Sequence, residues 1–246
     1  MTDPATIPPP PPKVEGPGVF DDLLEVLVSP AKVFARRAKG AGAMFLVVAI
    51  ALGALGYTAK PVLEPIMDAQ MAKGMAAAQA ANPQMTAEQM ATGMAFQRKL
   101  YPVYFVAGPA MALFVLGLSV WVFGKIFGAA VTFGSSFGIA ALAYVPRIIG
   151  GVITDVQAIL TSDTSTITNP SQLSIGPARF LDPTTSSAVM LAALMRVDIL
   201  VIWSTVLLAI AYMSAGKLSK PRAIAAAGTI WLVAGLFAVW GAVRSG

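Results

Sequence analysis

Three charged residues, Arg147, Arg196 and Asp198, stand within long apolar segments and are the residues of this chain best placed to do chemistry. Charges inside a membrane-spanning segment are costly, and they commonly serve ion transfer, ligand binding or helix pairing. If their two segments cross a membrane in opposite directions, a rise of about 1.5 Å per residue places Arg147 and Asp198 at similar depths. The spacing therefore predicts that Arg147 pairs with Asp198, and that Arg196 points outward toward Asp155 or Asp182. A structural ion pair, an ion or proton path, and charges that reach the interface stay open as alternatives.

No catalytic group is predicted. The chain contains no Cys and no His, which excludes thiol nucleophiles, disulfides, imidazole bases and imidazole metal ligands. Its 12 Asp and Glu residues are scattered, and no G-x-S-x-G nucleophile elbow occurs. We therefore expect a protein that is not an enzyme, with no cofactor and no catalytic or metal-binding residue.

Methionine is the remaining residue type that could hold a metal. Met67, Met71 and Met75 recur at every fourth position, and thioethers are soft ligands for Cu(I). These three span roughly 12 Å along one helix, too far for a single metal ion. A second methionine-containing helix over 85–94 could close on the first, but an adaptable apolar packing face is the commoner use of such residues.

The composition is that of a membrane protein. Hydrophobic residues make up 57% of the 246 residues and charged residues 12%, against about 25% charged in an ordinary soluble domain. Too little polar surface is available to cover a globule in water. The basic residues that give the net charge of +5 are therefore expected to orient the chain in a membrane. No nucleic-acid partner is expected.

Five apolar segments predict an all-α integral membrane bundle of five transmembrane helices, which forms a membrane domain over 40–246. The predicted spans are about 42–59, 101–124, 133–153, 188–215 and 223–243. Two long loops, 60–100 and 154–187, separate them. The first loop reads as two helices joined by a turn at Asn82-Pro83, with Thr86 and Gln89 as a capping box. In the second loop, residues 167–175 suggest the edge of a small hairpin.

Basic residues set the expected orientation. The short turn 217–222 and the segment 32–39 are both strongly basic, and both indicate a cytoplasmic N-terminus with the C-terminus outside. The two long loops then lie outside. We expect a multi-pass protein of the bacterial inner membrane.

Two segments precede the first span. Residues 1–19 read as a disordered proline-rich tail. Residues 20–39 read as an amphipathic juxtamembrane segment that Pro30 divides. It either lies in the lipid headgroup region or packs on the bundle. Its candidate interaction surface consists of Phe20, Leu24, Leu27, Pro30 and Phe34.

Several motifs together resemble bacterial members of the Yip family, named for Ypt/Rab-interacting proteins. They are Leu24-Glu-Val-Leu-Val-Ser-Pro-Ala-Lys-Val-Phe34, the run from Gly128 to Ala143-Tyr144-Val145-Pro146, Val197-Asp198-Ile199-Leu-Val-Ile202-Trp203, and Leu218-Ser219-Lys220 before Trp231. The resemblance covers about residues 20–243 and implies five spans with a cytosolic N-terminus. Eukaryotic relatives bind prenylated small GTPases in vesicle traffic, and their N-terminal acidic-aromatic motif is absent here. The resemblance therefore implies a fold and not an activity.

The leading hypothesis is a non-enzymatic membrane protein that acts as a scaffold, an assembly partner or a membrane organiser. Its expected partners are the lipid bilayer and an unidentified membrane or cytosolic protein, and a homo-oligomer stays open. The alternative is a small transporter or channel component that uses Arg147, Arg196 and Asp198. The discriminating feature is whether these charges satisfy one another in a dry bundle or line a cavity.

Overall fold

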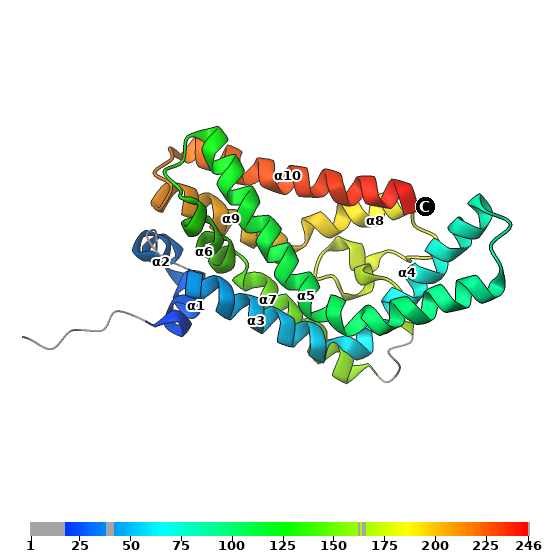
Figure 1. Cartoon of the computed structure of the whole chain (residues 1–246). Helices are drawn as coiled ribbons and strands as arrows, with labels where there is room; N and C mark the ends of the chain where they lie inside the picture. Colours follow the sequence, from blue (N-terminus) through cyan, green and yellow to red (C-terminus); the bar gives the residue numbers. More distant parts are fainter. Residues whose placement is uncertain (1–17, 38–41, 162, 164–165, 246) are drawn as a thin grey trace, which may run out of the picture.

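The computed structural model describes residues 18–37, 42–161, 163 and 166–245, and these contain helices but no strand (Figure 1). The predicted proline-rich tail lies outside the described residues, apart from its last two. The α-helices are α1 (Val19–Val28), α2 (Pro30–Arg37), α3 (Gly42–Thr58), α4 (Lys60–Ala81), α5 (Ala87–Phe127), α6 (Phe133–Ala143), α7 (Val145–Leu160), α8 (Ala188–Leu194), α9 (Ile199–Ser214) and α10 (Lys220–Ser245). Three short 3₁₀ helices are η2 (Pro170–Leu173), η3 (Pro177–Phe180) and η4 (Met195–Val197). The all-α class is confirmed.

Some helices are long and apolar enough to cross a membrane alone, and others reach that length only as bent pairs. The stretches Ala87–Phe127, Phe133–Gln157 and Lys220–Arg244 are each long and apolar enough to cross a membrane. Two further pairs reach that length only together: α3 with α4, bent by 76°, and Ala188–Val197 with α9, bent by 52°. The described residues therefore supply three to five spans. The segment predicted as the span 188–215 is divided at Asp198, where the helix breaks.

Helix α5 is longer than the span predicted for it. Its 41 residues correspond to about 60 Å, roughly twice the thickness of a bilayer's hydrocarbon core. The second helix predicted within 60–100 is therefore the first part of α5. The turn before it and its capping box are confirmed, since the Thr86 hydroxyl accepts from the Gln89 N–H at 3.2 Å and the Gln89 side chain accepts from the Thr86 N–H at 3.0 Å.

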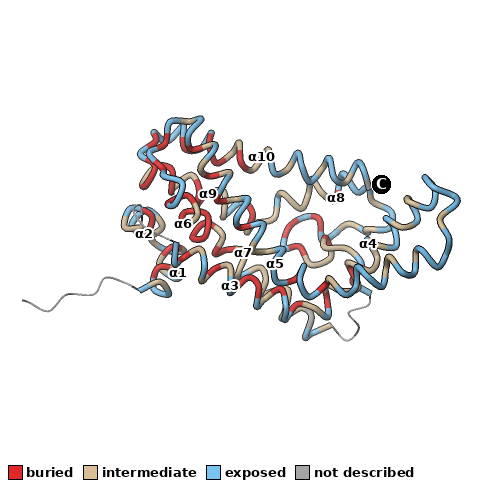
Figure 2. The backbone as a smooth tube through the Cα atoms, viewed as in Figure 1, coloured by how far each residue is buried: buried red, intermediate tan, exposed pale blue. Residues whose placement is uncertain are grey.

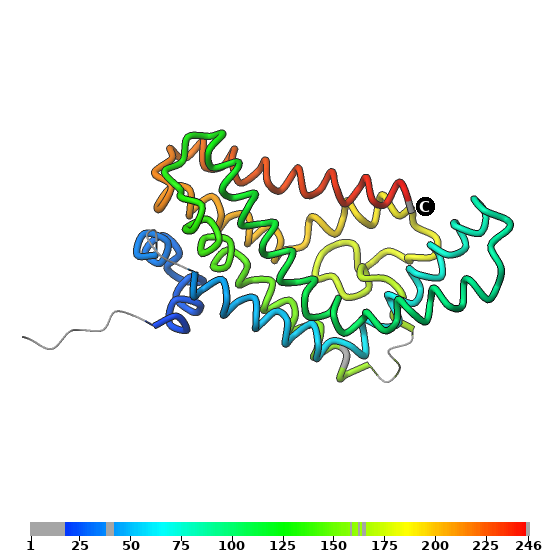
Figure 3. Tube along the Cα trace, viewed as in Figure 1, coloured from blue at the N-terminus to red at the C-terminus, as the bar shows by residue number. Residues whose placement is uncertain are grey.

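The bundle has two distinct ends. The turns after α5 and after α9 lie side by side, because the Ala130 N–H donates to the Gly216 carbonyl at 2.9 Å. Helices α1 and α2 pack at this same end, against α6 and α9. We call it the α1–α2 end. Figure 3 shows α4 and the end of α10 at the opposite end, which we call the α4 end.

The core lies between α3, α5, α6 and α9, where the buried residues concentrate (Figure 2). Two close contacts fix these helices. Gly56 of α3 lies directly against the backbone of Phe105 on α5. The buried Tyr212 hydroxyl of α9 donates to the Val120 carbonyl of α5 at 2.7 Å. Outward faces of α5 and α10 expose large apolar side chains, among them Val115, Leu236 and Phe237, as expected of helices that face lipid.

The predicted hairpin within 154–187 is wrong. Residues 154–160 continue α7. The later part of the predicted loop forms η2 and η3, because Asn169 caps η2 through the Ser171 N–H at 2.9 Å and a proline begins each turn. The loop folds back against the bundle and reaches the break between α8 and α9. Gly176 is needed there, since a Cβ at this position would lie 2.9 Å from the Asp198 Cα.

Candidate functional site

Asp198 caps a helix. Its carboxylate accepts from the Leu200 N–H at 2.8 Å, which caps α9, and from the Ile175 N–H at 3.0 Å and the Ser174 hydroxyl at 3.2 Å. Asp is among the preferred residues at a helix N-terminus for this reason. Asp198 thus joins the folded-back loop to the start of α9.

The predicted pair between Arg147 and Asp198 is not formed. Among the described residues, neither Arg147 nor Arg196 makes an ion pair. Arg147 instead lies 5.9 Å from the ring centre of Tyr144. The prediction failed because the oxygens of Asp198 already serve three donors on its own side of the bundle.

Arg196 also differs from its prediction, which pointed it toward Asp155 or Asp182. Asp155 accepts from the Thr58 hydroxyl at 2.7 Å. Arg196 turns instead toward α10: its guanidinium donates to the Trp231 carbonyl at 3.1 Å, and its own carbonyl accepts from the Trp231 indole N–H at 3.1 Å. This reciprocal contact ties the break between α8 and α9 to the middle of α10. The indole N–H of Trp231 was the sequence signal for such a partner.

Two cavities meet at Arg147. The larger, about 470 Å³, is bounded by α3, α5, α7 and the folded-back loop, and both Arg147 and Asp198 line it. The smaller, about 250 Å³, lies between α5, α9 and α10, and both Arg147 and Arg196 line it. Ala112, Tyr144 and Arg147 belong to the walls of both. The three predicted residues thus lie around two cavities with a shared wall and are not paired with one another.

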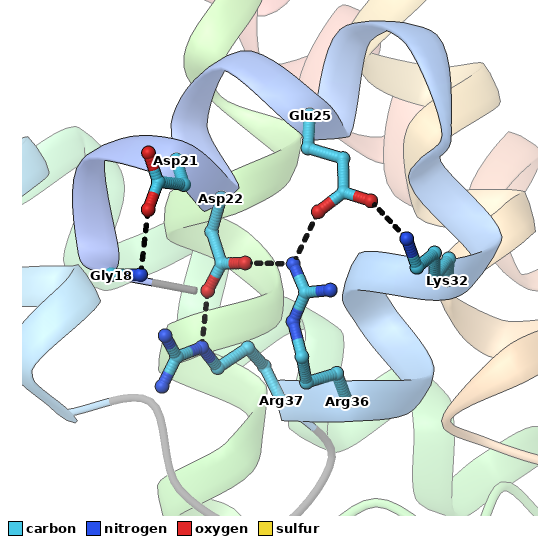
Figure 4. Close-up of polar contacts among 7 residues, drawn as sticks. All are labelled: Gly18, Asp21, Asp22, Glu25, Lys32, Arg36 and Arg37. Atoms are coloured by element: carbon cyan, nitrogen blue, oxygen red, sulfur yellow. Dashed lines mark hydrogen bonds and ion pairs between the residues drawn. The ribbon is translucent and has the colours of Figure 1, made fainter. Parts of the chain in front are cut away.

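A second polar group links α1 to α2 (Figure 4). The Asp22 carboxylate is fully buried and binds Arg36 through one oxygen and Arg37 through the other. Glu25 also binds Arg36, at 2.6 Å, and binds Lys32 at 2.9 Å. We call these five residues the α1–α2 ion cluster. Sequence analysis missed it, although acidic residues before Pro30 and basic residues after it are the signal of two oppositely charged helices folded against each other.

The cluster makes the attachment of α1 sensitive to acid. Hydrogen bonds from Arg36 and then from Lys32 lower the pKa of Glu25, and the Glu25 and Asp22 carboxylates raise the pKa of Arg36. A carboxyl whose pKa is lowered by folding stabilises the fold above its ordinary pKa of about 4.3, and this contribution is lost as the pH falls through the lower folded value.

We therefore expect α1 to loosen on acidification. Amide hydrogen exchange over residues 19–28, corrected for its intrinsic pH dependence, should show protection that falls as the pH is lowered through about 4.3 and below. In Glu25→Gln, residues 19–28 should be less protected at neutral pH, and acidification should lower their protection by a smaller amount. Equal losses in the two proteins would contradict a role for Glu25 in this attachment.

The predicted interaction surface divides into buried and exposed residues. Phe34 is 1% exposed and packs in the core, and Leu27 is partly buried against it. Phe20 and Leu24 are 74% and 73% exposed, and Val28, which the prediction omitted, is 80% exposed. Packing on the bundle, the second of the two interpretations of this segment, is therefore confirmed for α2, and α1 keeps one exposed apolar line.

The three methionines of α4 lie along a shallow space between α4 and α5. Met67, Met71 and Met75 line it together with Gln97 and Tyr101, and the Tyr101 hydroxyl lies 3.9 Å from the Met71 sulfur. No group of three or more acidic, His or Cys side chains that could hold a metal occurs among the described residues. The three methionines thus lie together on one side of this space at the α4 end.

Apolar outer faces, span-length helices and a small polar interior define a multi-pass α-helical membrane protein. A family model described as the Yip1 domain matches residues 24–242. The chain therefore belongs to the Yip1 domain family, as the motifs in its sequence indicated. No curated protein and no solved structure matches the chain.

Proposed function

We propose that this protein is a non-enzymatic scaffold or assembly partner in a bacterial inner membrane and that it binds another protein through α1. The observation that carries the proposal is the ridge formed by Phe20, Leu24 and Val28, which we call the α1 ridge. These side chains recur at every fourth position and are at least 73% exposed. A ridge at this spacing fits the groove of a second helix, and large exposed apolar side chains in a row are typical of an interaction surface.

The occupant we propose is the apolar face of a helix in a partner protein. Helix α1 carries Asp21, Asp22 and Glu25 and no basic residue. A helix that lies on a membrane surface instead places lysines and arginines toward anionic headgroups. The basic residues of α2 are engaged with Asp22 and Glu25. Charge therefore favours a protein over a lipid surface.

The proposed orientation places the α1–α2 end in the cytoplasm. Lys125 precedes one turn at this end, and the basic segment 217–222 forms the other. Short basic loops are retained on the cytoplasmic side. The α1 ridge would then be available to cytosolic or membrane partners.

Site-specific photo-crosslinking in native membranes tests this proposal. A photoreactive residue replaces Leu24, and the cross-linked peptides are identified by mass spectrometry. We expect a helical segment of one other protein, lost when Phe20→Ser and Val28→Thr are added. These exposed residues contribute little to the core, so the bundle should stay folded.

A photoreactive residue at Phe96, which is 62% exposed and lies away from α1, serves as the matched control and should not capture this protein. Cross-links to lipid alone would overturn the proposal. Cross-links to a second copy of the chain would replace the partner with a homo-oligomer and would also overturn it.

A second candidate function, as a transporter or channel component, is favoured by the cavity of about 470 Å³ that Arg147 and Asp198 line. Charged residues that line a cavity, rather than pair in a dry bundle, are typical of ligand or ion paths. Reconstituted vesicles that show no flux dependent on Arg147 would exclude it.

A further inference from the structure

Two arginine side chains give the smaller cavity a positively charged wall. Its wall is apolar except for a few side chains, of which Arg147 and Arg196 are the only charged ones among the described residues. It lies within the spans, since Trp231 stands near the middle of α10. Low dielectric surroundings make an unpaired charge costly at such a depth.

Neither arginine has an anionic partner among the described residues. Arg147 contacts the Tyr144 ring, and Arg196 contacts the ring and the carbonyl of Trp231. The Asp198 carboxylate lines the other cavity, where it accepts from Ser174, Ile175 and Leu200, and it makes no ion pair with either arginine. Two positive charges therefore face the smaller cavity, and no acidic side chain is among the described residues of its wall.

Unused polar atoms line the same space. The Nε of Arg196 and the hydroxyl of Ser204 are buried and lack hydrogen-bond partners, and both residues form part of the cavity wall. Buried polar groups in native proteins are nearly always bonded. Two guanidinium groups and a hydroxyl around one space make a set of donors with no anionic acceptor among the described residues of the wall.

We propose that this cavity binds the phosphoryl group of an anionic ligand, held between Arg147 and Arg196. The planar guanidinium fork matches phosphate oxygens and keeps its charge in apolar surroundings. Exposed Val115 and Phe237, from the outward faces of α5 and α10, also line the cavity. The cavity thus borders the lipid-facing surface, and a ligand with an apolar body fits it best. An anionic phospholipid and free phosphate share the required chemistry.

Native mass spectrometry of the full chain in mild detergent tests the site. The protein is titrated separately with phosphatidylglycerol, with phosphatidylcholine and with inorganic phosphate. We expect one phosphatidylglycerol to bind the wild type about tenfold more tightly than the R147Q/R196Q variant, the effect of losing charge-assisted hydrogen bonds. Phosphatidylcholine, with no net charge, should distinguish the two proteins less.

The matched control is Arg179→Gln, which removes an exposed arginine of η3 outside both cavities and should bind as the wild type does. R147K/R196K keeps amino groups but loses the planar forks, and it should bind more weakly than the wild type and more tightly than R147Q/R196Q. Lipid-free R147Q/R196Q should melt no lower than the wild type, which shows that it folds.

Binding of inorganic phosphate without phosphatidylglycerol, lost in R147Q/R196Q, would support the site and assign it to free phosphate. If R147Q/R196Q binds phosphatidylglycerol and inorganic phosphate as tightly as the wild type does, the proposal is overturned. This site lies in the spans and does not depend on the α1 ridge, so the two proposals can fail separately.

Discussion

Gly56→Ala is expected to prevent α3 from packing on α5. An added Cβ would overlap the carbonyl oxygen of Phe105 and lie 3.1 Å from its carbonyl carbon. These are backbone atoms in the middle of a helix, so no rotamer change can make room. Overpacking of a core destabilises a protein by about 1–3 kcal/mol and occasionally by more, and a clash with backbone favours the upper end of that range. The measurement is the thermal midpoint in detergent, together with the monodisperse fraction on size exclusion.

Gly108→Ala is the matched control, because it lies on α5 and an added Cβ there meets nothing within 4 Å. It should leave the thermal midpoint unchanged or raise it slightly, since alanine favours a helix over glycine by up to about 1 kcal/mol. If Gly56→Ala behaves like Gly108→Ala, the close crossing of α3 and α5 is not required for the fold.

Signals between near neighbours in the sequence predicted local structure well. The Thr86 and Gln89 capping box, the turn at Asn82-Pro83 and the helix boundary at Pro30 all occur where the sequence placed them. Each depends on a side chain and a backbone group a few residues apart. Hydropathy likewise located the apolar segments, because burial in lipid depends on composition.

The bend of one span and the partners of its charges could not be predicted in the same way. Asp198 was interpreted as one half of an ion pair, whereas it caps α9 and binds Ser174 and Ile175 of a distant loop. Depth along a straight helix was the argument for its pairing with Arg147, and the 52° bend removes that argument. Contacts between residues far apart in sequence depend on how the loop folds back, which hydropathy does not report.

The α1–α2 ion cluster was a different kind of omission, because its signal is local. Residues 20–39 were interpreted as an amphipathic segment, and the basic residues of 32–39 as a signal of orientation, without pairing its acidic and basic residues. Folding α2 back on α1 at Pro30 brings these charges together instead. The burial of Val33 and Phe34 beside them shows why α2 must pack on the bundle rather than on lipid.

Asp22→Ala is therefore expected to release α1 from α2. The carboxylate is fully buried and binds two arginines, so its removal leaves both guanidiniums without their shared anion. Removing one partner of a buried ion pair costs about 3–5 kcal/mol, and the partial exposure of Arg36 and Arg37 favours the lower end of that range. The measurement is amide hydrogen exchange over 19–37, which should accelerate while α9 and α10 keep their protection.

Asp21→Ala is the control, because Asp21 is exposed and accepts only from the Gly18 N–H at 2.8 Å. It should change exchange by far less, in keeping with the loss of a helix cap.

A double-mutant cycle with Arg36→Met isolates the pair: removing both partners should cost less than the two single losses together. Because the α1 ridge is presented by this same helix, Asp22→Ala should also weaken the cross-link from position 24, although Asp22 itself is buried and cannot touch a partner. Strict additivity in the cycle, with the cross-link unchanged, would mean that the hydrophobic contacts of α1 alone hold the ridge in place.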